Sequence, residues 1–160
     1  MIKQEIIYCD FVDFYFNNNL SISKSDIKKQ YLDLLSELTI IENISVELFE
    51  SNLIRINSIG KIIIGYVIND IGLFELVGSG TIIIEPKIIR AGMSVGHIED
   101  IVIKSNWRGK KISQSILNKL SHFASESNCY KVILDCVESV CPVYKSNGFE
   151  IKGIQMAKYF

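Results

Sequence analysis

Residues 96–113 read Gly-His-Ile-Glu-Asp-Ile-Val-Ile-Lys-Ser-Asn-Trp-Arg-Gly-Lys-Lys-Ile-Ser, in which an isoleucine-rich run gives way to a polar, basic loop. The β-branched side chains favour a strand over 97–104. Beyond the loop, apolar residues recur at a spacing of three and four, which predicts a helix over 112–127 that stops at Asn128. Residues 130–136, Tyr-Lys-Val-Ile-Leu-Asp-Cys, are mostly apolar and predict another strand. A strand, a helix and a second strand in this order predict a central β-α-β unit.

Upstream of this unit, the sequence predicts a strand over 5–16 and then two helices. Ser23 or Ser25 can cap the first helix, whose apolar residues lie on one face and which we expect to end near Thr39. The second helix is predicted to be shorter, over 45–53.

Short isoleucine-rich runs separated by turn residues fill 54–103, the pattern of a strand meander. A turn at Asn69-Asp70-Ile71-Gly72 separates strands predicted over 62–68 and 73–85. Gly78-Ser79-Gly80 fits either a further turn or a bulge inside one long strand, and we favour the bulge.

The C-terminal part is predicted to form a helical turn over 142–146 and a final strand from Gly148 toward Phe160. Together the elements predict an α+β fold with a mixed sheet. The chain has 160 residues, of which 48% are hydrophobic and 22% charged. These values fit one packed domain spanning residues 1–160.

The composition excludes several classes of function. A formal net charge of −1 leaves no overall basic field for nucleic acid, so any anionic ligand needs a local site. No apolar run has the roughly eighteen residues of a membrane span, and we expect a cytoplasmic protein. The four cysteines lack CxxC spacing and only two histidines are present, so we expect reduced, mostly buried thiols and no metal site.

The loop at 104–111 is a candidate anion site because it leads into a predicted helix. The first N–H groups of a helix have no intrahelical acceptor, and the helix dipole is positive there. Gly109 permits close approach to the backbone, and Arg108, Lys110 and Lys111 add positive charge. The alternative is a solvated loop that carries a few surface cations.

This loop resembles the pyrophosphate loop of the GNAT superfamily of acyl-CoA-dependent N-acetyltransferases, Arg/Gln-x-x-Gly-x-Gly/Ala between a strand and a helix. Here it reads Arg108-Gly-Lys-Lys-Ile-Ser113, with Lys111 and Ser113 at the usual glycine positions. The resemblance implies a central, splayed mixed sheet with helices on both faces. It also implies that acetyl-CoA is the acetyl donor, bound by Ile101, Val102, Ile103, Arg108, Gly109, Lys110, Lys111, Ile112, Ser113 and Gln114.

Within the superfamily, the chain is similar to the family of N-acetyltransferases that act on glucosamine 6-phosphate. The matching segments are Gly96-His-Ile-Glu-Asp-Ile101, the strand 128–136, Tyr144-Lys-Ser-Asn-Gly-Phe149 and Leu38-Thr39. The resemblance implies direct acetyl transfer in a ternary complex, without a metal, to the amine of glucosamine 6-phosphate for UDP-N-acetylglucosamine biosynthesis. It further implies a homodimer with shared active sites.

Three groups are candidates for the chemistry of transfer. Glu99 and Asp100 are neighbours in a strand and should point to opposite faces, with Glu99 the first candidate to accept the proton of the attacking amine. A backbone N–H near Ile101, freed by splaying or a bulge, suits the oxyanion. The resemblance implies that Tyr144 donates to the leaving sulfur. Solvated carboxylates and a core tyrosine are the alternative interpretations.

Asp135 lies inside an apolar run, where an unpaired charge is costly, so we expect a partner for it. The resemblance implies that Asp135 contacts the sugar hydroxyls or the amine; an internal ion pair is the alternative.

The resemblance also indicates residues that bind the acceptor. Thr39 falls where the family contacts the sugar, and Glu99 and Asp100 belong to the same set. Lys87 and Arg90 fall where the family contacts the phosphate, although a solvated hairpin end is the alternative. Lys158 stands near the position of a family arginine, and Val140 stands where the family commonly has an asparagine that contacts the cofactor; His97 is interpreted as structural.

Two other functions remain open at this point. One is a GNAT enzyme that acetylates a different small amine or a peptide N-terminus. The other is a non-catalytic module that binds acyl-CoA, suggested by the altered glycine positions at Lys111 and Ser113.

Overall fold

A computed structural model describes residues 5–69 and 71–160. In this part of the chain one five-stranded sheet has the order β1-β2-β3-β4-β5. Neighbouring strands are antiparallel up to β4, and β5 lies parallel to β4. The strands are β1 (Ile7–Asp10), β2 (Gly60–Ile68), β3 (Phe74–Glu85), β4 (Ser94–Ile103) and β5 (Cys129–Leu134).

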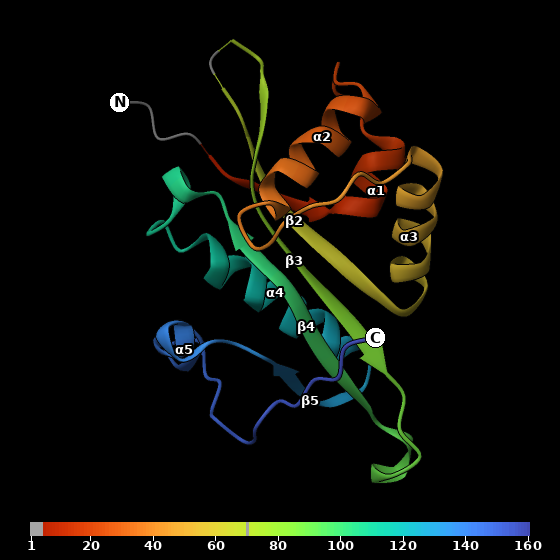
Figure 1. Cartoon of the computed structure of the whole chain (residues 1–160), viewed down its shortest axis with the longest axis vertical. Helices are drawn as coiled ribbons and strands as arrows, with labels where there is room; N and C mark the ends of the chain where they lie inside the picture. Colours follow the sequence, from red (N-terminus) through yellow and green to blue (C-terminus); the bar gives the residue numbers. More distant parts are fainter. Residues whose placement is uncertain (1–4, 70) are drawn as a thin grey trace.

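Helices cover both faces of the sheet (Figure 1). One core joins three N-terminal helices to the sheet, and a second core joins α4 to the opposite face. The predicted α+β fold and β-α-β unit, β4-α4-β5, are confirmed. The α-helices are α1 (Phe11–Asn17), α2 (Lys24–Leu35), α3 (Val46–Ile59), α4 (Ile112–Glu126) and α5 (Cys141–Lys145).

The strand expected over 5–16 is wrong beyond Asp10, where α1 begins. The Asp10 side chain caps this helix by accepting hydrogen bonds from the N–H groups of Val12 and Asp13, at 2.8 and 3.1 Å. Phe11, Phe14 and Tyr15 share a helical spacing and are buried against the sheet. Capping and this aromatic face outweigh the strand preference of the individual residues.

The next two helices begin where predicted and end elsewhere. Ser23 caps α2 and Ser45 caps α3. α2 ends at Leu35 rather than near Thr39, whereas α3 continues to Ile59 through residues expected to form strand. Ile54 and Ile59 are more than half exposed, so the isoleucine content of this segment does not reflect a buried strand.

β3 is one long strand, as the bulge interpretation of Gly78-Ser79-Gly80 required. Its pairing with β4 shifts register between Ser79 and Thr81. The turn before it is closed by a hydrogen bond from the Gly72 N–H to the Asn69 carbonyl, 2.8 Å. Asp70, also assigned to this turn, lies outside the described residues.

The final strand expected from Gly148 is wrong: the structure assigns no strand to 149–160. Much of this segment is solvent-exposed, including Ile154 and Phe160, and it has no neighbouring strand to pair with. It follows α5, which lies beyond β5 (Figure 1). The cysteines are also less buried than expected, since Cys136 is exposed and the other three are half-buried.

No helix among the described residues is long and apolar enough to cross a membrane. Within the same residues, no group of three or more potential ligands is placed to hold a metal ion.

Candidate active site

The sheet opens between β4 and β5. The two strands pair from Ser94 with Cys129 to Ile98 with Leu134, and β4 then continues to Ile103 paired with β3 only. Residues 99–103 of β4 therefore have no strand partner on this side. Apart from the Ile103 carbonyl, which accepts a hydrogen bond from Arg108 Nε, their backbone groups on this edge can bind an extended ligand with amide groups.

A bulge in β4 lies at the point where the strands separate. Glu99 pairs with Thr81 and Val102 pairs with Ser79, so Asp100 and Ile101 together face Gly80. A Cβ on Gly80 would lie 2.4 Å from Ile101 Cδ1 and 2.8 Å from Ile116 Cγ2, so a larger residue would displace these side chains. The bulge expected near Ile101 is present.

The bulge also sets the directions of the two acidic side chains. Asp100 has a φ of 52°, in the left-handed region, so Glu99 and Asp100 do not follow the regular alternation expected for a strand. The prediction that they point to opposite faces rests on a regular pleat, and that pleat is interrupted here.

Two neighbouring carboxylates and its own partial burial act on Glu99. Burial, followed by the charges of Asp100 and Asp135, raises the pKa of Glu99 above its ordinary value. Burial alone raises the pKa of Asp100. A carboxylate with a raised pKa is a better proton acceptor near neutral pH, so the environment favours Glu99 as a base.

Past β4, a short loop leads into α4. Gly109 and Lys111 both have positive φ, 77° and 61°. The first intrahelical bond of α4 runs from the Ser115 N–H to the Lys111 carbonyl, 3.1 Å. The N–H groups of 112–114 precede this bond and are available to an anion. The left-handed conformation of Lys111 explains why a glycine suits this position.

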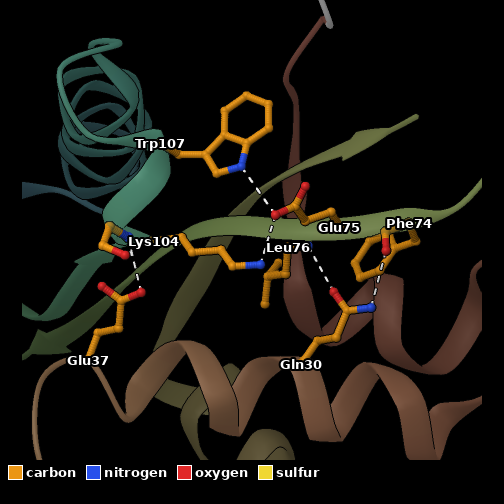
Figure 2. Close-up of polar contacts among 8 residues, drawn as sticks. Gln30, Glu37, Phe74, Glu75, Leu76, Lys104 and Trp107 are labelled. Carbon is orange, nitrogen blue, oxygen red and sulfur yellow. Dashed lines mark hydrogen bonds and ion pairs between the residues drawn. The ribbon is translucent and has the colours of Figure 1, made fainter. Parts of the chain in front are cut away.

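Hydrogen bonds to a side chain of β3 hold the start of this loop in place (Figure 2). Glu75 Oε1 accepts a hydrogen bond from Lys104 Nζ at 2.8 Å and another from Trp107 Nε1 at 3.2 Å. Gln30 of α2 binds the backbone of β3 on either side, accepting from the Leu76 N–H at 3.0 Å and donating to the Phe74 carbonyl at 3.2 Å.

A polar hollow of about 230 Å³ lies between these groups and α2, lined partly by Glu37 and Asp33. None of the residues predicted to perform the chemistry lines it. The open edge of β4 is therefore the better candidate for the reaction centre.

Arg108, predicted to bind the cofactor, is held in place within the chain. Its Nε donates to the Ile103 carbonyl at 3.1 Å, and its Nη2 pairs with Glu37 Oε2 at 2.8 Å. Glu37, Glu75 and Gln30 were missed by the sequence reasoning. Their partners are distant in the chain, and no local pattern marks them.

Tyr144 of α5 lies on the β5 side of the opening and packs edge-on against Phe149, with ring centroids 6.0 Å apart. Burial, and then the nearby Cys136, raises the pKa of its hydroxyl. The hydroxyl is therefore protonated at neutral pH and can donate a proton. Asp135 lies one residue beyond β5 and is exposed, with its carboxylate accepting from Gln155 Nε2 at 2.9 Å. It is not the strand-interior carboxylate that the sequence suggested.

Two of the predicted phosphate-binding residues, Lys87 and Arg90, lie apart from this centre within the chain. Lys87 pairs with Glu85, and the Arg90 guanidinium lies 5.4 Å from the centre of the Tyr130 ring. Both belong to the β3–β4 connection, at the opposite end of β4 from the bulge. Lys158 lies in the exposed C-terminal segment, and Thr39 lies on the exposed segment after α2. His97 contacts Glu85 at 2.7 Å.

Sequence comparison agrees with this architecture. The model of the Acetyltransferase (GNAT) family matches residues 42–149, which include the sheet from β2 onward, α4 and α5. The chain therefore belongs to the acetyltransferase (GNAT) family.

Individual relatives show which acetyltransferases the chain is similar to. The chain is 35% identical over 136 residues to Glucosamine 6-phosphate N-acetyltransferase of Arabidopsis thaliana, covering 85% of this chain and 91% of that protein. It is 36% identical over 137 residues to Glucosamine 6-phosphate N-acetyltransferase 1 of Dictyostelium discoideum, covering 84% and 85%. The crystal structure of the Arabidopsis thaliana enzyme matches with a TM-score of 0.80 and 28% identity, covering 98% of this chain and 99% of that one.

Proposed function

We propose that this protein transfers the acetyl group of acetyl-CoA to the amine of glucosamine 6-phosphate, giving N-acetylglucosamine 6-phosphate and CoA. The observation that carries the proposal is the open edge of β4 beside Glu99. The chain is also 35% identical to a relative named Glucosamine 6-phosphate N-acetyltransferase. Both reactants bind together, so the acetyl group passes directly to the amine.

The open edge and the following loop suit the acetyl donor. The backbone groups of 101–103 on the β5 side, other than the Ile103 carbonyl that Arg108 occupies, can bind the amides of the pantetheine arm, as a neighbouring strand would. The N–H groups at the start of α4 face the pyrophosphate, together with Lys110 and Lys111. Lys110 lies over the Trp107 ring at 3.9 Å, which restricts where its charge can reach.

The acceptor amine must lose a proton as it attacks the thioester. Glu99 is the proposed base, acting directly or through water, because its pKa is raised and it adjoins the separation of the strands. The bulge disrupts regular pairing at Ile101, which leaves a backbone N–H to stabilise the oxyanion. Asp100, Asp135 and Thr39 complete the proposed acceptor set.

The CoA thiolate that leaves the tetrahedral intermediate needs a proton. Tyr144 of α5, which follows the strand that separates from β4, is the proposed donor, because its hydroxyl carries a proton at neutral pH. The C–S bond breaks as this proton moves to sulfur, and the resulting tyrosinate is reprotonated from solvent. No step requires a metal.

The acceptor phosphate requires cations beyond those near the bulge, and we propose that a homodimer supplies them. Within one chain Lys87 and Arg90 lie at the opposite end of β4 from the bulge beside Glu99, and Lys158 lies in the exposed C-terminal segment, so a second chain can complete the site with them. The exposed apolar side chains of the C-terminal segment support such an association, among them Ile154, Met156 and Tyr159. We place the enzyme in the cytoplasm, in UDP-N-acetylglucosamine biosynthesis.

The test is acetyl-CoA-dependent release of free thiol with glucosamine 6-phosphate, unphosphorylated glucosamine and a panel of other amines. A clear preference in kcat/KM for glucosamine 6-phosphate is expected. Equal rates with the unphosphorylated sugar would contradict the proposed phosphate site, and faster turnover of another amine would favour the second GNAT activity. Binding of CoA without turnover of any amine would indicate a non-catalytic module.

A further inference from the structure

Glu37 joins two segments that the proposed function assigns to different ligands. It lies in the turn after α2, where its N–H donates to the Leu34 carbonyl at 3.1 Å and the next N–H, of Leu38, donates to Leu35 at 2.9 Å. These bonds fix the direction in which Glu37 projects. Thr39, proposed to contact the acceptor sugar, follows two residues later.

The Glu37 carboxylate reaches the cofactor loop with both of its oxygens. Oε1 accepts a hydrogen bond from the Ser105 N–H at 3.0 Å, and Oε2 pairs with Arg108 Nη2 at 2.8 Å. Figure 2 shows the first of these contacts crossing from the end of α2 to the backbone that follows Lys104. Because Arg108 Nε also binds the Ile103 carbonyl, Glu37 is linked to the end of β4.

These contacts contribute little to the stability of the fold and instead hold the segment that follows α2 in position. The Arg108 side chain is 61% exposed and the Glu37 side chain 24% exposed, so solvent weakens the ion pair. The bond from a backbone N–H to a charged carboxylate is directional and stronger than a neutral one. Losing Glu37 should therefore leave the fold intact while releasing the segment that follows α2.

We propose that Glu37 is a positioning residue that couples the cofactor loop to the acceptor segment 38–45. Occupation of the loop by CoA restrains Ser105 and Arg108, and through Glu37 this restraint reaches the backbone of 38–45. The coupling is reciprocal, so an acceptor bound at Thr39 favours the loop conformation that holds the donor. The identity of the acceptor in this inference rests on the proposed function. The contacts that link Glu37 to Ser105 and Arg108 do not depend on it.

Hydrogen–deuterium exchange of the backbone amides of 38–45, with and without CoA, tests the link without any acceptor. CoA is expected to slow exchange there in the wild type and to have little effect in Glu37→Ala. Glu37→Gln keeps an oxygen for the Ser105 N–H and should retain part of the effect. Asp33→Asn is the matched control, because Asp33 lies one turn earlier and its carboxylate pairs with Lys29 of the same helix.

Kinetics at saturating acetyl-CoA supply the second readout. Glu37→Ala should lower kcat/KM for the acceptor about tenfold, the scale of one lost charged hydrogen bond, while the Kd of CoA changes little. In a double-mutant cycle, Glu37→Ala should cost less when Arg108 is already alanine.

The outcomes separate this inference from the proposed function. If the wild type acetylates glucosamine 6-phosphate but Glu37→Ala matches it in kcat/KM and in CoA-dependent exchange, the coupling is wrong. If the wild type fails to turn over that sugar, the proposed function is wrong, and the exchange experiment still decides the coupling. Equal losses in Glu37→Ala and Asp33→Asn would show a general effect of α2 and overturn the role of Glu37.

Discussion

Ile98 and Leu134 form the last backbone pair between β4 and β5, and β4 runs on to Ile103 paired with β3 but without a partner on the β5 side. The bulge at Asp100 and Ile101 follows this pair within three residues. Parallel strands that continued to pair would satisfy the edge of β4 internally and leave no room for a ligand. Because the strands separate, β4 carries backbone groups without a strand partner on the β5 side. The same strand carries the carboxylates of Glu99 and Asp100 and leads directly into the cofactor loop.

Replacing Tyr144 by phenylalanine tests the proposed proton donor. Tyr144→Phe keeps the ring that packs on Phe149 and removes only the hydroxyl. We expect kcat to fall by about 100-fold, the lower range for one acid–base group, with little change in the Kd of CoA. Thiol release gives kcat, and calorimetric titration gives the Kd.

Tyr8→Phe is the matched control, because Tyr8 lies in β1, at the opposite edge of the sheet from β5. It should leave kcat near the wild-type value. An unchanged kcat in Tyr144→Phe would remove Tyr144 from the chemistry and leave it as a packing residue.

The pH profile tests Glu99. Its pKa is raised, chiefly by burial, so the carboxylate becomes protonated at a higher pH than an ordinary glutamate. The value of kcat/KM should therefore fall on the acidic side as the pH drops through this raised pKa. Glu99→Gln should lower kcat/KM at neutral pH and lose this limb of the profile, which is measured from pH 5 to 9 with thiol release.

As the pH rises, ionisation of Glu99 should lower the free energy of unfolding while it raises kcat/KM. A carboxyl whose pKa is raised on folding binds its proton more tightly in the folded state, so its ionisation destabilises the fold as the pH rises. Glu99→Gln should consequently be as stable as the wild type or more so at pH 7, by urea unfolding. Glu126→Gln, on the exposed end of α4, should change neither profile. Loss of stability together with activity in Glu99→Gln would indicate a structural role.

The cofactor loop and the β-α-β unit could be predicted because their signals are local. The spacing of Ile112, Ile116 and Leu120 defines one buried face of α4, and the loop before it is polar and short. The bulge was also signalled, since glycines at 78 and 80 leave space that Ile101, Ile103 and the α4 side chains fill. In these places local preference and tertiary packing agree.

Elsewhere tertiary contacts decided the outcome. Phe11 and Phe14 have high strand propensity, yet the Asp10 cap and burial against α2 and α3 make a helix of them. Asp135 seemed to lie within a strand because apolar residues precede it, but pairing with β4 ends at Leu134. Glu37 and Arg108 are 71 residues apart, and no local sequence pattern connects them.

The conformation of Lys111 makes a prediction about stability. Its φ of 61° strains a side chain with a Cβ and suits glycine. Lys111→Gly should raise the free energy of unfolding by up to about 1 kcal/mol. Lys110→Gly is the contrast, because Lys110 has no positive φ and packs over Trp107, so its loss should destabilise. A destabilised Lys111→Gly would mean that its charge matters more than its backbone. Urea unfolding measures both.

The junction between α3 and β2 depends on Gly60. A Cβ at this position would lie 1.9 Å from the Ile82 carbonyl oxygen and 3.0 Å from the Ile83 Cα, both backbone atoms of β3. Gly60→Ala must therefore push β2 away from β3, and we expect a loss of at least about 2 kcal/mol in the free energy of unfolding. Gly153→Ala is the matched control, since no atom lies within 4 Å of its added Cβ. It should unfold at the same urea concentration as the wild type. If Gly60→Ala also unfolded there, β2 and β3 would have to separate at this end without loss of packing, and the tight junction between α3 and β2 would not hold.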